Sequence, residues 1–234
     1  MGFVSTAWRA LLTFVYPDHC PVCGSPLAFG ERAICLGCLT RLPRLGWHTN
    51  PFNEIHQRLG HQVAVERAGA WFLYRRGSEF THIVHDFKYH GAWALAVDVG
   101  RMMAEEMNPD GFFDGVDLLL PVPLSYSKMA RRGYNQAERV ARGISQVTGI
   151  AIGDNLVART HKTQTRRSLF ERMANVEEIY HVENADELDG LHVMVVDDVI
   201  TTGSTMSANI SAIHSAAPTA RISVLSVGAT TRTG

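Results

Sequence analysis

Strands that alternate with helices over residues 69–234 predict an α/β fold, an open parallel sheet with helices on both faces. The apolar run Leu191-His-Val-Met-Val-Val196 supports this fold, because a strand without polar alternation is typical of a central parallel strand covered on both sides. Hydrophobic residues make up 46% of the 234-residue chain, which allows a sizeable core and excludes a mostly disordered protein. All four cysteines precede residue 39, so we expect a small module before the sheet.

The four cysteines form two Cys-x2-Cys pairs, Cys20 with Cys23 and Cys35 with Cys38, separated by eleven residues. Two such pairs are typical of a zinc ribbon, in which each pair gives two thiolates to a tetrahedral Zn²⁺. A closed shell of four thiolates leaves no position for a substrate, so we expect a structural zinc. The alternative is two disulfides in a secreted domain. It is disfavoured because we expect no signal peptide and the 196 residues after Cys38 contain no cysteine.

These patterns divide the chain into three parts. Residues 1–45 are expected to hold a helix over 5–16 and the cysteine module, which ends at Pro43. Residues 46–68 form a polar connecting segment with a short helix, and residues 69–234 form the α/β domain. In that domain we expect strands at 69–74, 116–122, 191–196 and 222–227, and helices at 78–87, 92–107, 135–147 and 204–216.

The segment from Val195 to Thr205 carries the most informative chemical pattern. Asp197 and Asp198 come at the end of the buried strand, and open α/β sheets bind ligands at the carboxyl ends of their strands. A turn rich in threonine, serine and glycine then begins a helix, whose free N–H groups suit a phosphate group. Gly203 lets the backbone approach a ligand without a side chain in the way. No Gly-Lys-Ser/Thr motif is present, which argues against a P-loop nucleotide site.

The distribution of charge indicates a local site for a polyanion. The net charge of −1 gives the whole chain no attraction to nucleic acid or anionic lipid. Residues 121–173, however, contain ten Lys and Arg but three Asp and Glu, a local net charge of +7. For Arg139 and Arg142 on a predicted helix, a solvated basic face is the favoured interpretation. For Arg131, Arg132 and the basic loop of residues 159–172, we favour binding of a polyanion. The charge fits both diphosphate and single-stranded DNA.

The segment around Asp197 resembles the phosphoribosyl-diphosphate (PRPP) binding signature of type I phosphoribosyltransferases. The whole chain resembles the competence protein F (ComF) family, which joins an amino-terminal zinc ribbon to such a domain. The resemblance covers nearly the full length and implies a type I phosphoribosyltransferase-like sheet. Its other marks are Phe87-Lys88-Tyr89-His90-Gly91, Pro121-Val122-Pro123-Leu124, Arg132-Gly133-Tyr134-Asn135-Gln136, and Arg159 with Gln164, Arg172 and Asn175.

The resemblance implies a role for each part of the site. Asp197 and Asp198 would bind the ribose hydroxyls, directly or through Mg²⁺. The residues of the turn would hold the 5′-phosphate: Thr201, Thr202, Gly203, Ser204 and Thr205. The diphosphate would lie on the loop Pro121, Val122, Pro123 and Leu124, with Arg131 and Arg132 beside it. Lys88 either contacts the diphosphate or simply ends its helix before Gly91. A mobile loop over residues 159–175 would close over the substrate and includes Arg159, Gln164, Arg166 and Arg172.

Two functions follow from the resemblance. The first is an enzyme that binds Mg²⁺·PRPP and transfers its phosphoribosyl group to a nitrogen base with release of diphosphate. The base is not named by the sequence, because type I enzymes recognise it with a variable hood, here expected within residues 45–95. The second is a non-catalytic adaptor of the DNA-uptake machinery that binds PRPP, single-stranded DNA or partner proteins. No apolar run reaches the roughly 18 residues of a membrane-spanning helix, and we expect a cytoplasmic protein.

Overall fold

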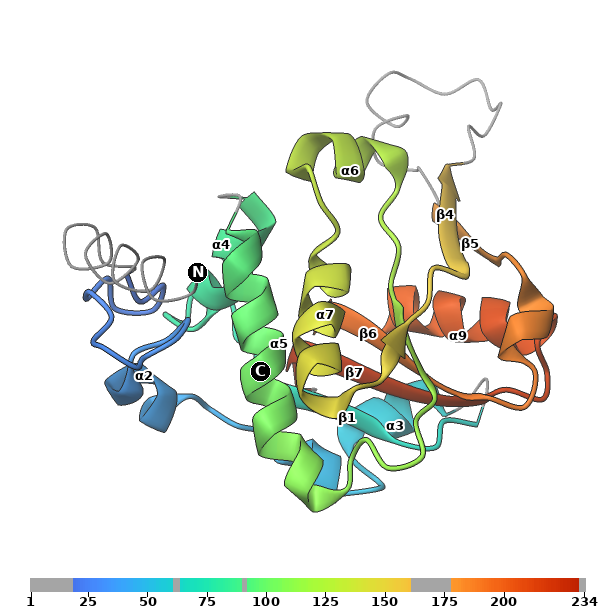
Figure 1. Cartoon of the computed structure of the whole chain (residues 1–234), viewed down its shortest axis with the longest axis horizontal. Helices are drawn as coiled ribbons and strands as arrows, with labels where there is room; N and C mark the ends of the chain where they lie inside the picture. Colours follow the sequence, from blue (N-terminus) through green and yellow to red (C-terminus); the bar gives the residue numbers. More distant parts are fainter. Residues whose placement is uncertain (1–18, 61–63, 90–91, 161–177, 232–234) are drawn as a thin grey trace, which may run out of the picture.

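The computed structural model describes residues 19–60, 64–89, 92–160 and 178–231 (Figure 1). The helix expected over residues 5–16 lies outside the described residues. No helix in the described ranges is long and apolar enough to cross a membrane.

Five parallel strands form the central sheet in the order β1-β7-β6-β2-β3. Their bounds, with those of a separate antiparallel pair β4–β5, are β1 Ala68–Leu73, β2 Leu118–Pro121, β3 Ala151–Ile152, β4 Leu156–Thr160, β5 Glu178–Val182, β6 His192–Ile200 and β7 Arg221–Ala229. The most apolar predicted strand is therefore the middle strand, β6. The predicted open parallel sheet is confirmed.

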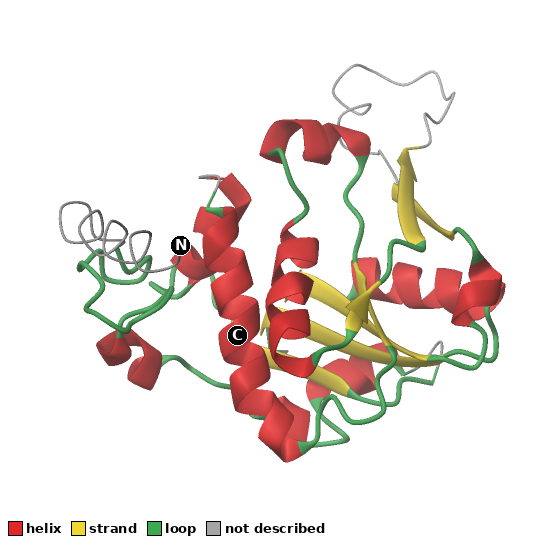
Figure 2. Ribbon diagram, in the orientation of Figure 1, coloured by secondary structure: helices red, strands yellow, loops and turns green. Residues whose placement is uncertain are grey.

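Helices lie on both sides of this sheet (Figure 2). Their bounds are α2 Leu36–Arg41, α3 Glu54–Leu59, α4 Thr81–Tyr89, α5 Trp93–Met107, α6 Tyr126–Arg132, α7 Gln136–Thr148 and α9 Ser204–Ala216, with short 3-10 helices at Trp47–Thr49, Asn108–Asp110 and Ala185–Leu188. Residues of α4, α5 and α7 belong to one buried cluster, and residues of α3 and α9 belong to another.

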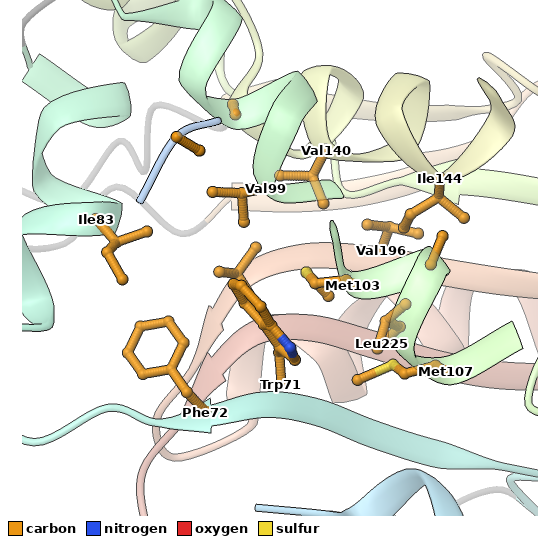
Figure 3. Close-up of a cluster of buried hydrophobic side chains, with 14 of the residues drawn as sticks. Trp71, Phe72, Ile83, Val99, Met103, Met107, Val140, Ile144, Val196 and Leu225 are labelled. Carbon is orange, nitrogen blue, oxygen red and sulfur yellow. The ribbon is translucent and has the colours of Figure 1, made fainter. Parts of the chain in front are cut away.

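Strand β6 contributes alternately to both cores, as expected of a central strand. Met194 and Val196 belong to the cluster under α4, α5 and α7, where Figure 3 shows Val196 near Val140 and Ile144. Val193 and Val195 belong to the cluster under α3 and α9. All four side chains on β6 are fully buried, which explains why the sequence alternates so little there.

Helices α5 and α7 pack closely because each has a glycine at the crossing. A Cβ on Gly100 would collide with the carbonyl oxygen of Val140, and one on Gly143 would collide with that of Val97. The absence of these two side chains lets the backbones touch, which holds α7 against α5 and fixes the loop that precedes α7.

The end of the cysteine module covers the free edge of β1. The N–H of Leu45 donates to the carbonyl of Trp71 at 3.2 Å, and the N–H of Leu73 donates to that of Pro43 at 2.8 Å. An uncovered edge strand is a template for unwanted pairing, so this segment protects the sheet as well as anchoring the module.

The structure differs from the predicted elements in several places: the short strand β3 and helix α2 were not predicted, and three further differences concern the site. Strand β6 continues to Ile200 instead of ending at Val196, because β7 is long enough to pair with it as far as Ala229. Helix α6 was not predicted, since its seven residues have no apolar periodicity. The pair β4–β5 was not predicted either, because it joins segments far apart in the chain, such as Leu156 and Val182.

Candidate functional site

The candidate site lies where the sheet reverses its direction of winding. From β2 the chain continues outward to β3, whereas from β6 it continues to β7 on the other side. Helix α7 follows β2 on one face of the sheet, and α9 follows β6 on the opposite face. The loops leaving β2 and β6 therefore part from each other, and such a switch point is where open α/β sheets bind ligands.

The register of β2 and β6 places the starts of the two predicted loops next to each other, before the loops diverge. Pro121 at the end of β2 pairs with Val196 of β6, and the N–H of Val122 donates to the carbonyl of Val196 at 2.8 Å. Asp197 is the next residue of β6, so the carboxylate pair begins where β2 stops. The loop of residues 121–124 thus adjoins the carboxylates, as the predicted diphosphate and ribose sites require.

The two adjacent carboxylates are half-buried and interact with each other and with a lysine. The N–H of Asp198 donates to Oδ1 of Asp197 at 2.7 Å. Lys88 Nζ lies 2.9 Å from Oδ1 of Asp198, and their side chains are 20% and 13% exposed. Burial and the charge of Asp198 raise the pKa of Asp197 to about 7, against the lowering effects of the Asp198 N–H, Lys88 and Lys128. A ligand that brings positive charge or hydroxyl donors would therefore favour ionised Asp197.

The turn after the carboxylates forms the amino end of α9. Gly203 is the N-cap and has a φ of +86°, a conformation that L residues with side chains rarely adopt. The first N–H groups of a helix have no partner within the helix, and the helix dipole makes this end positive. The hydroxyls of Thr202 and Ser204 lie 3.1 Å apart at the same turn. A small pocket is lined by residue 197 and residues 199–206, which places these donors around one space.

Arg58 of α3 holds the turn that begins α9 through hydrogen bonds, a role that the sequence did not predict. Its guanidinium donates to the carbonyl of Thr201 and, at 3.0 Å, to that of Thr230. Its neighbour Leu59 would lie 3.2 Å from a Cβ placed on Gly203. Arg58 lies in a polar connecting segment 143 residues before the turn, and no local pattern could have indicated this role.

The other predicted basic residues lie at the end of α6, in the segment that leads from β2 to α7. Arg131 is exposed and Arg132 half-buried at the end of α6, where Arg132 Nη1 donates to Gln136 Oε1 at 2.7 Å. Asn135, the N-cap of α7, donates to the carbonyl of Val122 at 3.0 Å and so fixes the predicted diphosphate loop. Contact of any of these residues with diphosphate stays a prediction.

The predicted mobile loop is only partly described. Arg159 lies in β4 and forms an ion pair with Glu183 at 3.3 Å, with both side chains more than half exposed. Gln164, Arg166 and Arg172 lie outside the described residues.

The four cysteines converge as the spacing predicts. Their sulfur atoms all lie within 4.8 Å of one another. The sulfurs of Cys23 and Cys35 are 3.7 Å apart, much longer than the roughly 2.05 Å of a disulfide, and all four thiols are free. Burial and the neighbouring thiols raise the pKa of Cys38 to about 12, while hydrogen bonds from Ser25 lower that of Cys23 to about 6. A bound cation would offset the charge of clustered thiolates, so the donor set fits a metal ion.

The chain is thus an α/β protein with a carboxylate pair and a glycine turn at the switch point of an open parallel sheet. Comparison with known families agrees. The family model described as phosphoribosyl transferase domain matches residues 111–233, and the chain belongs to that family.

Curated relatives extend the similarity to most of the chain. The competence protein F of Haemophilus influenzae is 28% identical over 217 residues, covering 88% of this chain and 81% of the relative. The DNA utilization protein YhgH of Salmonella typhimurium is 26% identical over 207 residues, covering 82% of this chain and 88% of the relative. A crystal structure of an adenine phosphoribosyltransferase is matched at 15% identity with a TM-score of 0.35, covering 75% of this chain and 89% of that one. The predicted resemblance to the competence protein F family is confirmed by the named relatives, the domain match and the four-cysteine cluster.

Proposed function

We propose that the protein binds Mg²⁺·PRPP at the switch point and transfers the phosphoribosyl group to a nitrogen base with release of diphosphate. The observation that carries this proposal is the direct succession of Asp197, Asp198 and the glycine turn of α9 at the end of the central strand, within a domain of the phosphoribosyl transferase family. A phosphate monoester at the turn and a diol at the carboxylates are the two chemical groups that this geometry suits.

Each part of PRPP has a counterpart in the chain. Asp197 and Asp198 accept hydrogen bonds from the ribose hydroxyls, and the N–H groups and hydroxyls of residues 201–205 hold the 5′-phosphate. The loop of residues 121–124 and the basic side chains of α6 face the diphosphate. Carboxylate oxygens are ligands that Mg²⁺ accepts, so Asp197 and Asp198 fit a hydrated magnesium ion, which when bound neutralises part of the charge of the leaving diphosphate.

The transfer requires little covalent chemistry from the protein. A nitrogen lone pair of the base forms a bond to C1 of the ribose, and the C1–O bond to diphosphate breaks, its electron pair leaving with the diphosphate. Because no side chain needs to act as nucleophile, the protein contributes position and charge stabilisation. The half-buried carboxylates and the rigid turn supply the position, since both are fixed by the two cores of the sheet.

The four-cysteine cluster binds one structural Zn²⁺ in this proposal. Four thiolates close a tetrahedral shell, which leaves no site for a substrate. Reduced thiols persist in the cytoplasm, so we place the protein there.

Calorimetry with PRPP tests the first half of the proposal. The parent protein should bind PRPP in the presence of Mg²⁺, and a screen of nucleobases should find one that releases diphosphate from it. Binding without release for every base would leave a PRPP sensor instead of an enzyme, and no binding would contradict the proposed site.

A second candidate is an adaptor that binds single-stranded DNA in DNA uptake. The relatives are named for competence and DNA utilization, and α6 carries an aromatic side chain, Tyr126, that is 84% exposed, on the same short helix as the exposed Arg131. Exposed aromatic side chains among basic residues stack bases of single strands. In this function, Tyr126→Ala should weaken binding of a single-stranded oligonucleotide while leaving PRPP binding unchanged, and the affinity should fall as salt rises.

A further inference from the structure

Helix α4 joins the two chemical centres of the molecule, the cysteine cluster and the carboxylate pair. Figure 1 shows α4 between the cysteine module and α5. Ile83 and Phe87 on its buried face belong to the same hydrophobic core as Ile34 and Leu42 of the module. All four side chains are at most 4% exposed, so the module and α4 are parts of one closely packed core, through which a change in the module can reach α4.

At its first end, α4 is connected to a metal-ligating cysteine through Arg41. The guanidinium of Arg41 donates to Sγ of Cys38 at 3.5 Å and to Oε1 of Glu79 at 2.9 Å. Glu79 lies two residues before α4 begins at Thr81. The ion pair of Arg41 with Glu79 is exposed and therefore weak by itself. The shared core therefore carries most of the connection between the module and α4, and Arg41 adds a polar contact to it.

At its other end, α4 carries Lys88 to Asp198. The 2.9 Å contact is mostly shielded from water, unlike the pair at Arg41, so it is less screened. The hydroxyl of Tyr134 donates to the carbonyl of Phe87, which ties the last turn of α4 to the loop before α7. Lys88 is thus held against the carboxylate pair by its own helix and not by a flexible segment.

We propose that Lys88 is a positioning residue of the carboxylate pair, and that α4 makes its position depend on the metal-loaded cysteine module. The inference rests on the function proposed above and names a regulation of the same site. Lys88 neutralises Asp198, so that the adjacent carboxylates repel each other less and Asp198 keeps one orientation. Lys88 also adds positive charge beside a polyanionic ligand. Loss of the metal would loosen the part of the shared core that holds Ile34 and Leu42, and would move Lys88 away from Asp198.

Charge removal tests the local part of the proposal. Lys88→Gln should weaken Mg²⁺·PRPP binding in calorimetry about 10-fold, and Lys88→Arg should restore it to within about 3-fold of the parent. The matched control is Arg142→Gln, which removes an exposed cation paired with Glu138 at 2.8 Å and should leave the affinity unchanged. Equal binding by Lys88→Gln and the parent would overturn the proposal.

A double-mutant cycle tests the connection through α4. Cys35→Ser should weaken PRPP binding about 5- to 10-fold in the parent but less than about 2-fold in the Lys88→Gln background. If Cys35→Ser does not fold, Arg41→Gln replaces it in the same cycle, because Arg41 is exposed and the fold should tolerate its loss. Arg41→Gln should weaken PRPP binding about 3-fold in the parent. If the parent binds PRPP, an equal loss of affinity in the parent and Lys88→Gln backgrounds, or no loss in either, would overturn the inference. A parent that binds no PRPP would overturn the proposed function as well.

Discussion

At the scale of single residues, the site depends on two adjacent carboxylates at the end of a central strand. Asp197 and Asp198 were predicted because they interrupt an apolar strand and precede a glycine turn, and both features are local in the sequence. Arg58, which supports that turn, and the pairing of Lys88 with Asp198 were not predicted. They depend on segments brought together by the folded sheet, and a single sequence carries no signal for such contacts.

The raised pKa of Asp197 predicts how stability changes with pH. Its pKa is about 7 in the folded protein against an ordinary value of 3.8, so between these pH values the folded state binds more protons than the unfolded state. The contribution of Asp197 to the free energy of unfolding should therefore fall as pH rises through this window, and Asp197→Asn should remove that contribution. Urea unfolding of both proteins at about pH 5 and pH 8 measures the difference. A difference in stability that stays constant with pH would contradict the pKa.

At the scale of elements, long apolar patterns were predictable and short or non-local ones were not. Strand β6 and helix α5 were identified from runs and spacings of apolar residues; α5 lies close to its expected bounds, and β6 begins close to its expected start but continues to Ile200. Helix α6 follows Ser125, whose side chain makes no capping hydrogen bond, and ends at Gly133, which has a left-handed conformation at a φ of +80°. The seven residues between them have no helical face to recognise.

The crossing of α5 and α7 gives a prediction at this scale. Gly143→Ala places a Cβ against the backbone of α5 and should lower the free energy of unfolding by roughly 1–3 kcal/mol or more, because the two helices must move apart. Gly37→Ala in α2 is the matched control, since nothing lies within 4 Å of the place its added methyl group would take, and the change should be neutral or slightly stabilising. Chemical denaturation measures both. Equal effects would show that the helices do not need the close approach.

At the scale of the whole molecule, the cysteine module and the sheet share a core. The module was predicted as a separate part, and its ligand spacing is confirmed by the cluster of four sulfurs. Its share in the core of the sheet and its pairing with the edge of β1 were not predictable from the spacing, because Ile34 and Leu42 are only scattered apolar residues in the sequence. The module therefore contributes buried contacts to the core of the sheet.

Metal removal should show this dependence. We expect one Zn²⁺ per chain in protein prepared under reducing conditions. Structural zinc sites in finger peptides contribute roughly 10–16 kcal/mol, so Cys35→Ser should unfold the module. The sheet should stay folded, with most of its far-UV circular dichroism, but melt several degrees lower. Elemental analysis that finds no zinc would contradict the site, and an unchanged melting temperature would contradict the shared core.

Titration calorimetry of Mg²⁺·PRPP into the parent protein and Asp197→Asn tests the central claim most directly. Hydrogen bonds to charged groups contribute roughly 1.5–3 kcal/mol each, so the variant should bind PRPP roughly 10- to 150-fold more weakly at an unchanged fold. The same change removes a repelling charge and should strengthen the binding of single-stranded DNA, so the two candidate functions predict opposite signs. Unchanged PRPP affinity in Asp197→Asn, with Asp198→Asn equally silent, would show that the ribose does not bind at this carboxylate pair.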